Sequence, residues 1–322
     1  MTADAPVDSQ PDHYRAVLTG AKNLPRIRVA VIHPVDFHAI EAAITAADQG
    51  LIEPVLIGPR QRVLKAAAEY AALRGGDISG WDLIDVEHSD AAAEKGVELA
   101  ACGKVDALMK GALHTDELLH PVVAAKSGLK TESRISHAYV LDVPSYHKPL
   151  IITDAAINIA PDLAVKADIC RNAIALWHCL FGHDRMPRVA LLSAVETVNP
   201  AMPSTIDAAA LCKMADRGQI TGALLDGPLA YDNIISRQAA LDKGITSEVA
   251  GDADIIVVPN IEAGNALAKQ LIYLGHANAA GIVLGARAPI ILTSRADSVH
   301  TRLLSCVAAM YLVDARKHGL IK

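Results

Sequence analysis

The feature that most constrains the fold is a regular alternation of short β-branched runs with longer alanine-rich amphipathic runs. Residues 27–33 (IRVAVIH) and 54–58 (PVLIG) are predicted strands, and residues 36–50 and 62–75 are predicted helices. Alternation at this spacing is typical of βαβ units on a parallel sheet. The predicted strands are apolar throughout, which indicates that helices cover both faces. The sequence therefore predicts an α/β protein whose sheets are rich in parallel strands.

The middle of the chain departs from this pattern. Residues 134–143 (RISHAYVLDV) and 148–155 (KPLIITDA) are strand-like runs joined only by the short link PSYH. Such a link predicts an antiparallel hairpin, because a parallel crossover needs about a dozen residues or more. The alternation then resumes, up to a last strand at 288–294 and a last helix at 297–313. A chain of 322 residues can form two α/β lobes, and we expect it to pass between them near this hairpin.

The amino-acid composition argues against nucleic-acid and membrane partners. Apolar residues make up 52% of the chain, aromatic residues only 3%, and the formal net charge is −6. Neither a basic surface nor an aromatic platform for nucleic acid is therefore expected. The N-terminus has no apolar signal segment, and no apolar run reaches the roughly 18 residues of a membrane span. We expect a cytoplasmic protein without nucleic-acid or membrane partners. Its five cysteines form no CxxC pair and are expected to be apolar filler, with a functional role left open for Cys306, which lies near the last motif.

Familiar cofactor and nucleophile motifs are missing from the sequence. It contains no G-x-x-x-x-G-K-[ST] loop, no G-x-G-x-x-G after the first strand, no G-x-S-x-G and no H-E-x-x-H. We therefore expect that an enzyme built on this chain needs no metal. Polar residues after the predicted strands are the better guide, because ligands of such sheets bind beyond the carboxyl ends of the strands.

The first polar segment is LMKGALHTDELL at 108–119. Lys110 and Gly111 end a predicted strand, and His114 and Thr115 open a helix. Gly111 permits close approach of a ligand, and free N–H groups at the helix start suit an anion. The same residues also fit a structural role in which Thr115 caps the helix. The residues alone leave the ligand role open.

Two further segments carry arginine. In TESRISH (131–137), Arg134 leads into a predicted central strand, which favours a position in a cleft. In GARAPIILTSRADS (285–298), Arg287 and Arg295 flank another strand. The planar donor fork of arginine suits phosphate and developing carbonyl charge. A surface ion pair between Arg295 and Asp297 that caps the last helix explains the second segment equally well.

These segments belong to a longer resemblance. From about residue 15 to residue 315 the sequence resembles the phosphate acetyltransferase/phosphate butyryltransferase family, especially the branch often fused behind an enoyl-CoA hydratase domain. RISHAYVLDVP, DGPLAYDNIIS and GIVLGARAPIILTSRADS carry it together with LMKGALHTDELL. The resemblance implies two α/β lobes with a cleft between them, akin to the isocitrate and isopropylmalate dehydrogenases. It also implies a homodimer, a first lobe of residues 1–145 and 288–322, and a second lobe of residues 146–287.

The implied activity is reversible acyl transfer between CoA and phosphate. Acetyl-CoA and phosphate give acetyl phosphate and CoA, by direct thiolate attack in a ternary complex. These molecules are substrates, and no cofactor is expected. Butyryl or propionyl transfer stays an alternative, because a single methylene changes affinity by only about 1–3 kcal/mol. Two other classes also stay open, a non-catalytic binder of CoA or acyl phosphate and a metal-dependent dehydrogenase of related fold.

The resemblance further implies roles for individual residues. Ser294 is expected to orient the CoA sulfur, and Arg295 to contact the acyl carbonyl and the phosphate. The base is Asp297 or His300, because acetate-type relatives carry an acidic pair where this chain has His300 and Thr301. An arginine of many such relatives is His120 here. The expected phosphate-binding residues are Arg134, Arg287, His114, Thr115 and Lys110, and the expected cleft wall that binds CoA contains Ser136, Asn265 and Lys269.

Overall fold

The computed structural model describes residues 14–292 and 298–321. The strands are β1 (Ile27–Ile32), β2 (Ile52–Gly58), β3 (Asp82–Asp85), β4 (Ala107–Lys110), β5 (Ser136–Asp142), β6 (Leu150–Thr153), β7 (Arg188–Leu192), β8 (Leu224–Leu229), β9 (Ile255–Val257), β10 (Asn278–Leu284) and β11 (Ile290–Ile291). The helices are α1 (Arg15–Ala21), α2 (Phe37–Asp48), α3 (Arg60–Arg74), α4 (Ser89–Ala101), α5 (Thr115–Val123), α6 (Leu163–Phe181), α7 (Pro203–Asp216), α8 (Tyr231–Ile235), α9 (Arg237–Asp242), α10 (Ile261–Tyr273) and α11 (Val299–Lys317).

All strands in the described ranges belong to one 11-stranded sheet, in the order β3-β2-β1-β4-β11-β10-β5-β6-β9-β7-β8. Strands β3, β2, β1, β4 and β11 are parallel to one another. Strand β10 is antiparallel to both neighbours, and β5 and β6 form the predicted hairpin. Strands β6, β9, β7 and β8 are again parallel. The expected α/β fold, rich in parallel strands, is confirmed.

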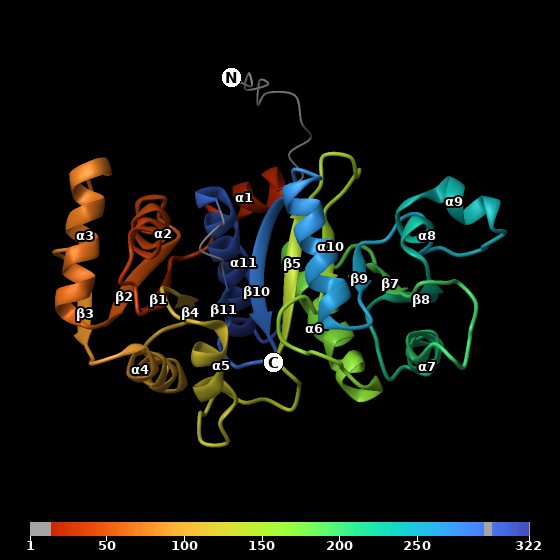
Figure 1. The fold of residues 1–322 in the computed structure, drawn as a ribbon, viewed down its shortest axis with the longest axis horizontal. Helices are drawn as coiled ribbons and strands as arrows, with labels where there is room; N and C mark the ends of the chain where they lie inside the picture. Colours follow the sequence, from red (N-terminus) through yellow and green to blue (C-terminus); the bar gives the residue numbers. More distant parts are fainter. Residues whose placement is uncertain (1–13, 293–297, 322) are drawn as a thin grey trace.

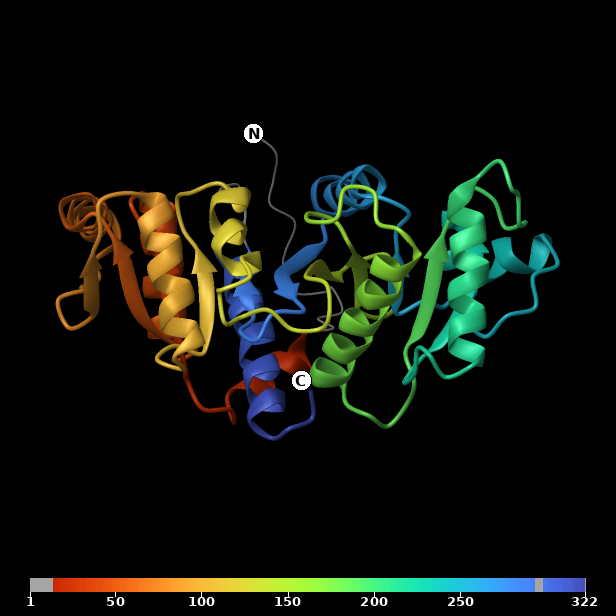
Figure 2. The same ribbon diagram turned by 90° about the horizontal axis from the view of Figure 1, so that it is seen from below.

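The two expected lobes share this sheet rather than having one sheet each. Their expected boundaries fall between β5 and β6 and between β10 and β11. In the sheet, however, β10 lies between β11 and β5, so strands of the two expected lobes interleave at the centre. Figures 1 and 2 show the segment from β1 to α4, in orange tones, and the segment from α7 to α9, in green to cyan, on opposite sides of these central strands. The residue limits of the lobes stay a prediction.

The two faces of the sheet carry different cores. One face has a single hydrophobic core that runs through both halves, with Val31 and Met109 on one side, Ile151 and Val257 on the other, and side chains of α2, α6 and α11. The other face has two clusters. One packs α4 and α5 on β1, β4 and β11, and the second packs α8, α9 and α10 on β6, β7 and β9. This second face is therefore divided near the centre of the sheet, and we call it the divided face.

Helix boundaries follow local capping. Asp36, Asp162, Asn260 and Ser298 each accept a hydrogen bond from the N–H group three residues later, and so begin α2, α6, α10 and α11. The last helix extends to Lys317, beyond the predicted end at 313, because buried residues such as Ala315 continue its apolar side. Within the described ranges, no helix is both long and apolar enough to cross a membrane.

Candidate active site

The carboxyl end of β4 carries the first polar segment, as predicted. Helix α5 begins at Thr115, so the capping residue is His114 and not Thr115: the His114 N–H group donates to Glu117 Oε2 at 2.7 Å. A Cβ on Gly111 would overlap the carbonyl oxygen of Ile32. Gly111 is therefore needed for close packing of the ends of β1 and β4, whether or not a ligand lies there.

His33 directly follows β1, beside this segment. Its φ angle is 55°, its side chain is buried, and its Nδ1 atom has no hydrogen-bond partner among the described residues. Burial lowers the pKa of His33, helped by the positive charge of Arg62 and opposed by the carboxylates of Glu117 and Asp36. Side chains from the starts of α2, α3 and α5 thus surround the carboxyl end of β1.

Arg134 and Ser136 lie where β5 begins and β10 ends. Leu284 pairs with Ser136 in the sheet. Asn172 of α6 donates to Ser136 Oγ and to the Arg134 carbonyl oxygen, both at 2.8 Å, and the Arg134 N–H group donates to Asp168 Oδ2 at 3.1 Å. The Arg134 side chain is exposed, and it has no partner in the described part of the chain. Ser136 is buried and points to α6, so in this structure it anchors the strand end.

Arg287 lies at the opposite end of β4 from Lys110 and His114. The Arg287 carbonyl oxygen accepts a hydrogen bond from Arg316 of α11. The next residue of α11, Lys317, pairs with Asp106, which directly precedes β4, at 2.8 Å. The structure therefore separates Arg287, and with it Arg134 at the start of β5, from Lys110, His114 and Thr115 at the carboxyl end of β4.

Asn265 and Lys269 lie on α10, next to the carboxyl end of β6. The buried Asp154 accepts four hydrogen bonds from Ala156, Ile157 and Asn158, and Asn265 Nδ2 donates to the Ala155 carbonyl oxygen at 3.1 Å. Lys269 is exposed one turn farther along. Residues 156 and 157 pack against the same cluster as Leu118 and Leu119 of α5. This turn therefore connects the α10 side of the divided face with α5.

His137 of β5 lies at the centre of the sheet. It is fully buried, its ring packs edge-on against Tyr139 at 4.5 Å, and neither ring nitrogen has a hydrogen-bond partner among the described residues. Burial lowers the pKa of His137 to about 4, although the carboxylate of Asp154 acts in the opposite direction. A Cβ on Gly281 would lie 2.5 Å from the Leu292 carbonyl oxygen and 3.3 Å from His137 Nε2. His137 therefore lies next to the end of the described segment that precedes the Ser-Arg motif.

The Ser-Arg motif itself, with Ser294, Arg295 and Asp297, lies outside the described residues. His300 is exposed in the first turn of α11, which Ser298 caps. Cys306, five residues after Thr301 in the same helix, is fully buried, and burial raises its pKa to about 12. Its thiol is therefore protonated at neutral pH, as expected for an apolar filler.

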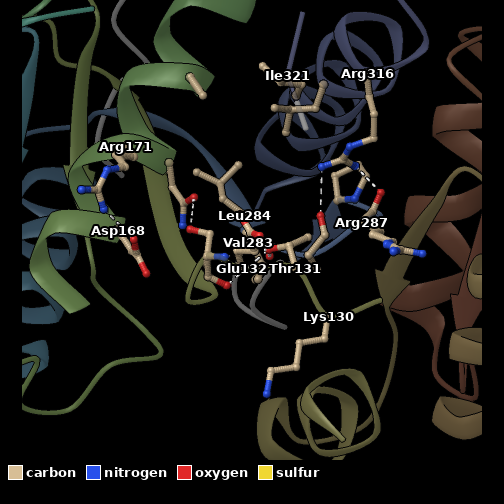
Figure 3. Close-up of a pocket in the computed structure, with 17 residues that line it drawn as sticks. Lys130, Thr131, Glu132, Asp168, Arg171, Val283, Leu284, Arg287, Arg316 and Ile321 are labelled. Carbon is tan, nitrogen blue, oxygen red and sulfur yellow. Dashed lines mark hydrogen bonds and ion pairs between the residues drawn. The ribbon is translucent and has the colours of Figure 1, made fainter. Parts of the chain in front are cut away.

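A pocket with a volume of about 830 Å³ lies where β10 ends, between α6 and the last turns of α11 (Figure 3). Four basic side chains line it, from Lys130, Arg171, Arg287 and Arg316, together with the acidic Glu132 and Asp168. Of these residues only Arg287 was predicted from the sequence. Lys130 is next to the TESRISH segment, but no motif marks Arg171 or Arg316, which only the packing of α6 and α11 brings to the same cavity.

The residues that the structure describes contain no group of three or more His, Cys, Asp or Glu side chains that could hold a metal ion.

Comparisons with known proteins agree with the resemblance. A profile of the phosphate acetyl/butaryl transferase family matches residues 65–310. A phosphate acetyltransferase of Rhizobium meliloti is 54% identical over 309 residues, which cover 96% of each protein. A phosphate butyryltransferase of Clostridium beijerinckii is 40% identical over 304 residues, or 94% of this chain and 98% of that protein.

A solved structure shares the fold as well. The crystal structure of a branched-chain phosphotransacylase from Enterococcus faecalis V583 matches with a TM-score of 0.76 and 30% identity, covering 89% of this chain and 99% of that one. Together with the sequence matches, this likeness extends over both halves of the sheet. The chain therefore belongs to the phosphate acetyl/butaryl transferase family.

Proposed function

We propose that this chain is a phosphate acetyltransferase, which converts acetyl-CoA and phosphate into acetyl phosphate and CoA and also catalyses the reverse. The observation that carries the proposal is the 54% identity to a phosphate acetyltransferase along 96% of both proteins. Butyryl transfer is the second candidate, because the identity to a phosphate butyryltransferase is 40%.

The reaction needs three contributions from the protein. In the direction that consumes acetyl phosphate, the CoA thiolate attacks the carbonyl carbon and a C–S bond forms. The bond between this carbon and the bridging oxygen breaks, and phosphate leaves with that oxygen. A base must take the thiol proton, because the thiolate is the nucleophile. Hydrogen-bond donors or cations must stabilise the negative oxygen of the tetrahedral intermediate. Further donors must hold the phosphate in position.

The Ser-Arg motif provides two of these groups in our proposal. Arg295 stabilises the carbonyl oxygen, and Ser294 orients the CoA sulfur. The base is Asp297 or His300, and the exposure of His300 is compatible with proton exchange with solvent. Leu292, two residues before Ser294, belongs to the same hydrophobic cluster as the buried residues of α5. This supports an arrangement in which the motif and α5 serve one site.

The phosphate site is proposed at the carboxyl end of β4. Lys110 supplies positive charge and the first turn of α5 supplies N–H groups from Thr115 onward, while His114 contributes its side chain, because its N–H group donates to Glu117 Oε2. Arg134 is proposed as a phosphate contact on the family resemblance alone, because it precedes β5, which begins beside Leu284 at the other end of β4. Asn265 and Ser136 are assigned a supporting role, because their side chains hydrogen-bond within the protein. Lys269 is a candidate contact for CoA.

The proposed assembly is a cytoplasmic homodimer that works without a bound cofactor. The family resemblance supports the dimer, and the substrates themselves carry all the atoms that the balanced reaction needs. No metal or redox group enters the proposed steps.

The test is phosphate-dependent release of CoA from acetyl-, propionyl- and butyryl-CoA, followed through the free thiol and without added metal. We expect release that requires phosphate and is fastest with acetyl-CoA. Faster release from butyryl-CoA would transfer the assignment to the butyryl branch. No release from any of the three by a folded protein would contradict the proposed function.

A further inference from the structure

His33, directly after β1, has no part in the steps proposed above. We propose that its imidazole contacts the phosphate of the acyl-transfer reaction, in a crevice between the carboxyl ends of β1 and β4. This inference rests on the proposed function, since it adds a substrate-binding residue to the proposed phosphate site.

The crevice lies where the strand order of the sheet reverses. In the order β3-β2-β1-β4, the chain runs outward from β1 to β3 and then returns to β4 on the other side of β1. Helix α2, which follows β1, packs on the undivided core, whereas α5, which follows β4, packs on the divided face. The chain therefore leaves these two neighbouring strands toward opposite faces, and ligands of open α/β sheets bind in the crevice that such a divergence creates.

The backbone holds His33 in a conformation that residues with a Cβ rarely adopt. Its φ angle is 55°. The His33 N–H group donates to the Ile57 carbonyl oxygen at 2.7 Å, and the His33 carbonyl oxygen accepts from Val35 at 2.9 Å and from Ala112 at 3.0 Å. Residues that their surroundings hold in such a conformation cluster at functional sites, where the strain keeps a side chain in one place.

The imidazole lacks the partner that a buried polar group normally has. His33 is only 4% exposed, and its Nδ1 atom is enclosed without a hydrogen-bond partner in the described part of the chain. Burial lowers the pKa of His33, so at neutral pH the ring is neutral, with one N–H donor and one lone pair. An oxygen atom of phosphate can accept the hydrogen bond that the chain leaves unmade.

The charged groups that act on this ring come from the first turns or caps of four helices, α2, α3, α4 and α5. They are Asp36, Arg62, His88 and Glu117. Both carboxylates already accept hydrogen bonds from backbone N–H groups. The Arg62 side chain, in contrast, is exposed and has no partner in the described ranges. Four helix N-termini, whose dipoles favour an anion, and an unpaired arginine thus surround the ring.

The crevice also borders the segment that contains the Ser-Arg motif. Strand β11 lies beside β4 and is parallel to it, so Leu292 comes to the same edge of the sheet. At the start of α11, Arg302 donates to the His38 carbonyl oxygen at 3.3 Å and pairs with Glu41 at 3.4 Å, so the first turns of α11 and α2 are in contact. A phosphate group beside His33 therefore lies toward both ends of that segment.

The experiment compares the full-length His33→Asn variant with the wild type in the direction that consumes acetyl-CoA and phosphate. Asparagine tolerates a positive φ angle, but its side chain is shorter, so KM for phosphate should rise about tenfold while KM for acetyl-CoA stays within about twofold. His33→Gln provides a longer N–H donor and should recover part of the affinity. The matched control is His276→Asn, because His276 has a φ angle of 53° but is exposed between α10 and β10. It should change neither KM.

A second variant keeps the test decisive if His33→Asn does not fold. Arg62→Ala changes an exposed side chain in the first turn of α3 and should raise KM for phosphate about threefold, whereas Arg74→Ala in the last turn of the same helix should not. Inorganic phosphate alone should raise the thermal unfolding midpoint of the wild type, and raise it less in His33→Asn than in His276→Asn.

The outcomes separate this inference from the proposed function. An unchanged KM for phosphate in active His33→Asn and Arg62→Ala variants, or equal increases of both KM values, would overturn the inference but not the proposed function. A folded wild-type protein without any acyl transfer would overturn the proposed function instead.

Discussion

His137 is the residue whose surroundings differ most from those of an ordinary buried histidine. Buried polar atoms nearly always have a hydrogen-bond partner, and an unpaired one costs about 1–3 kcal/mol. Both ring nitrogens of His137 lack such a partner among the described residues, and the side chain is 0% exposed. The imidazole therefore has to stay neutral in the folded protein.

This burial predicts a pH dependence of stability. The pKa of His137 falls from its ordinary value near 6.5 to about 4 on folding, so between these values only the unfolded chain binds the proton. The free energy of unfolding should therefore decrease as the pH falls from about 6.5 towards 4, by up to about 1.4 kcal/mol per pH unit from this group. The pH dependence should be shallower in His137→Gln, as measured by urea unfolding at pH 4.5, 5.5 and 7.0. Equal slopes in the two proteins would mean that His137 does not titrate in this way.

At the scale of secondary-structure elements, β10 contacts both α11 and the segment that leads to the Ser-Arg motif. The Gly281 N–H group donates to Ser305 Oγ of α11 at 2.9 Å, and its carbonyl oxygen accepts from Leu292. An added Cβ would lie 2.5 Å from the Leu292 carbonyl oxygen. The glycine thus permits close contact between β10 and the segment that leads to the Ser-Arg motif.

Gly281→Ala should therefore affect both stability and turnover. Overpacking at a tight contact costs about 1–3 kcal/mol, and a displaced Leu292 should shift the Ser-Arg motif, so we expect kcat to fall at least about tenfold. The matched control is Gly80→Ala, because an added Cβ there meets nothing within 4 Å. Thermal unfolding and steady-state kinetics of the two variants check the prediction. A stable Gly281→Ala protein with wild-type kcat would contradict it.

The elements themselves were largely predictable from the sequence, and their grouping was not. Alternating apolar runs predicted the strands and helices, and the short PSYH link predicted the β5–β6 hairpin, because both are local patterns. The separation of Arg287 from Lys110 depends on the path of the chain from β10 to β11 and on α11, which packs across both halves. Lys130, Arg171 and Arg316 meet only through tertiary packing, and neither spacing nor composition marks such a set.

At the scale of the whole molecule, the sheet and one of its cores are continuous between the two expected lobes. Hydrogen-bonded strands connect β3 at one edge with β8 at the other. The undivided core contains residues from both sides of the central strands, such as Ile44 and Leu211. A structure of this kind cannot lose one half without exposing apolar surface of the other.

We therefore predict that both halves unfold in a single transition. The chain has only two tryptophans, Trp177 inside the undivided core and Trp81 packed against its opposite end. Trp81→Phe leaves fluorescence that reports on α6, and Trp177→Phe leaves fluorescence that reports on the β3 side. In each variant, the fluorescence midpoint in urea should coincide with the far-UV circular dichroism midpoint of the same variant, which corrects for any stability lost through the substitution. A Trp81 signal that changes at a clearly different urea concentration from the circular dichroism signal would show that the two halves unfold independently, as separate lobes on a divided core would.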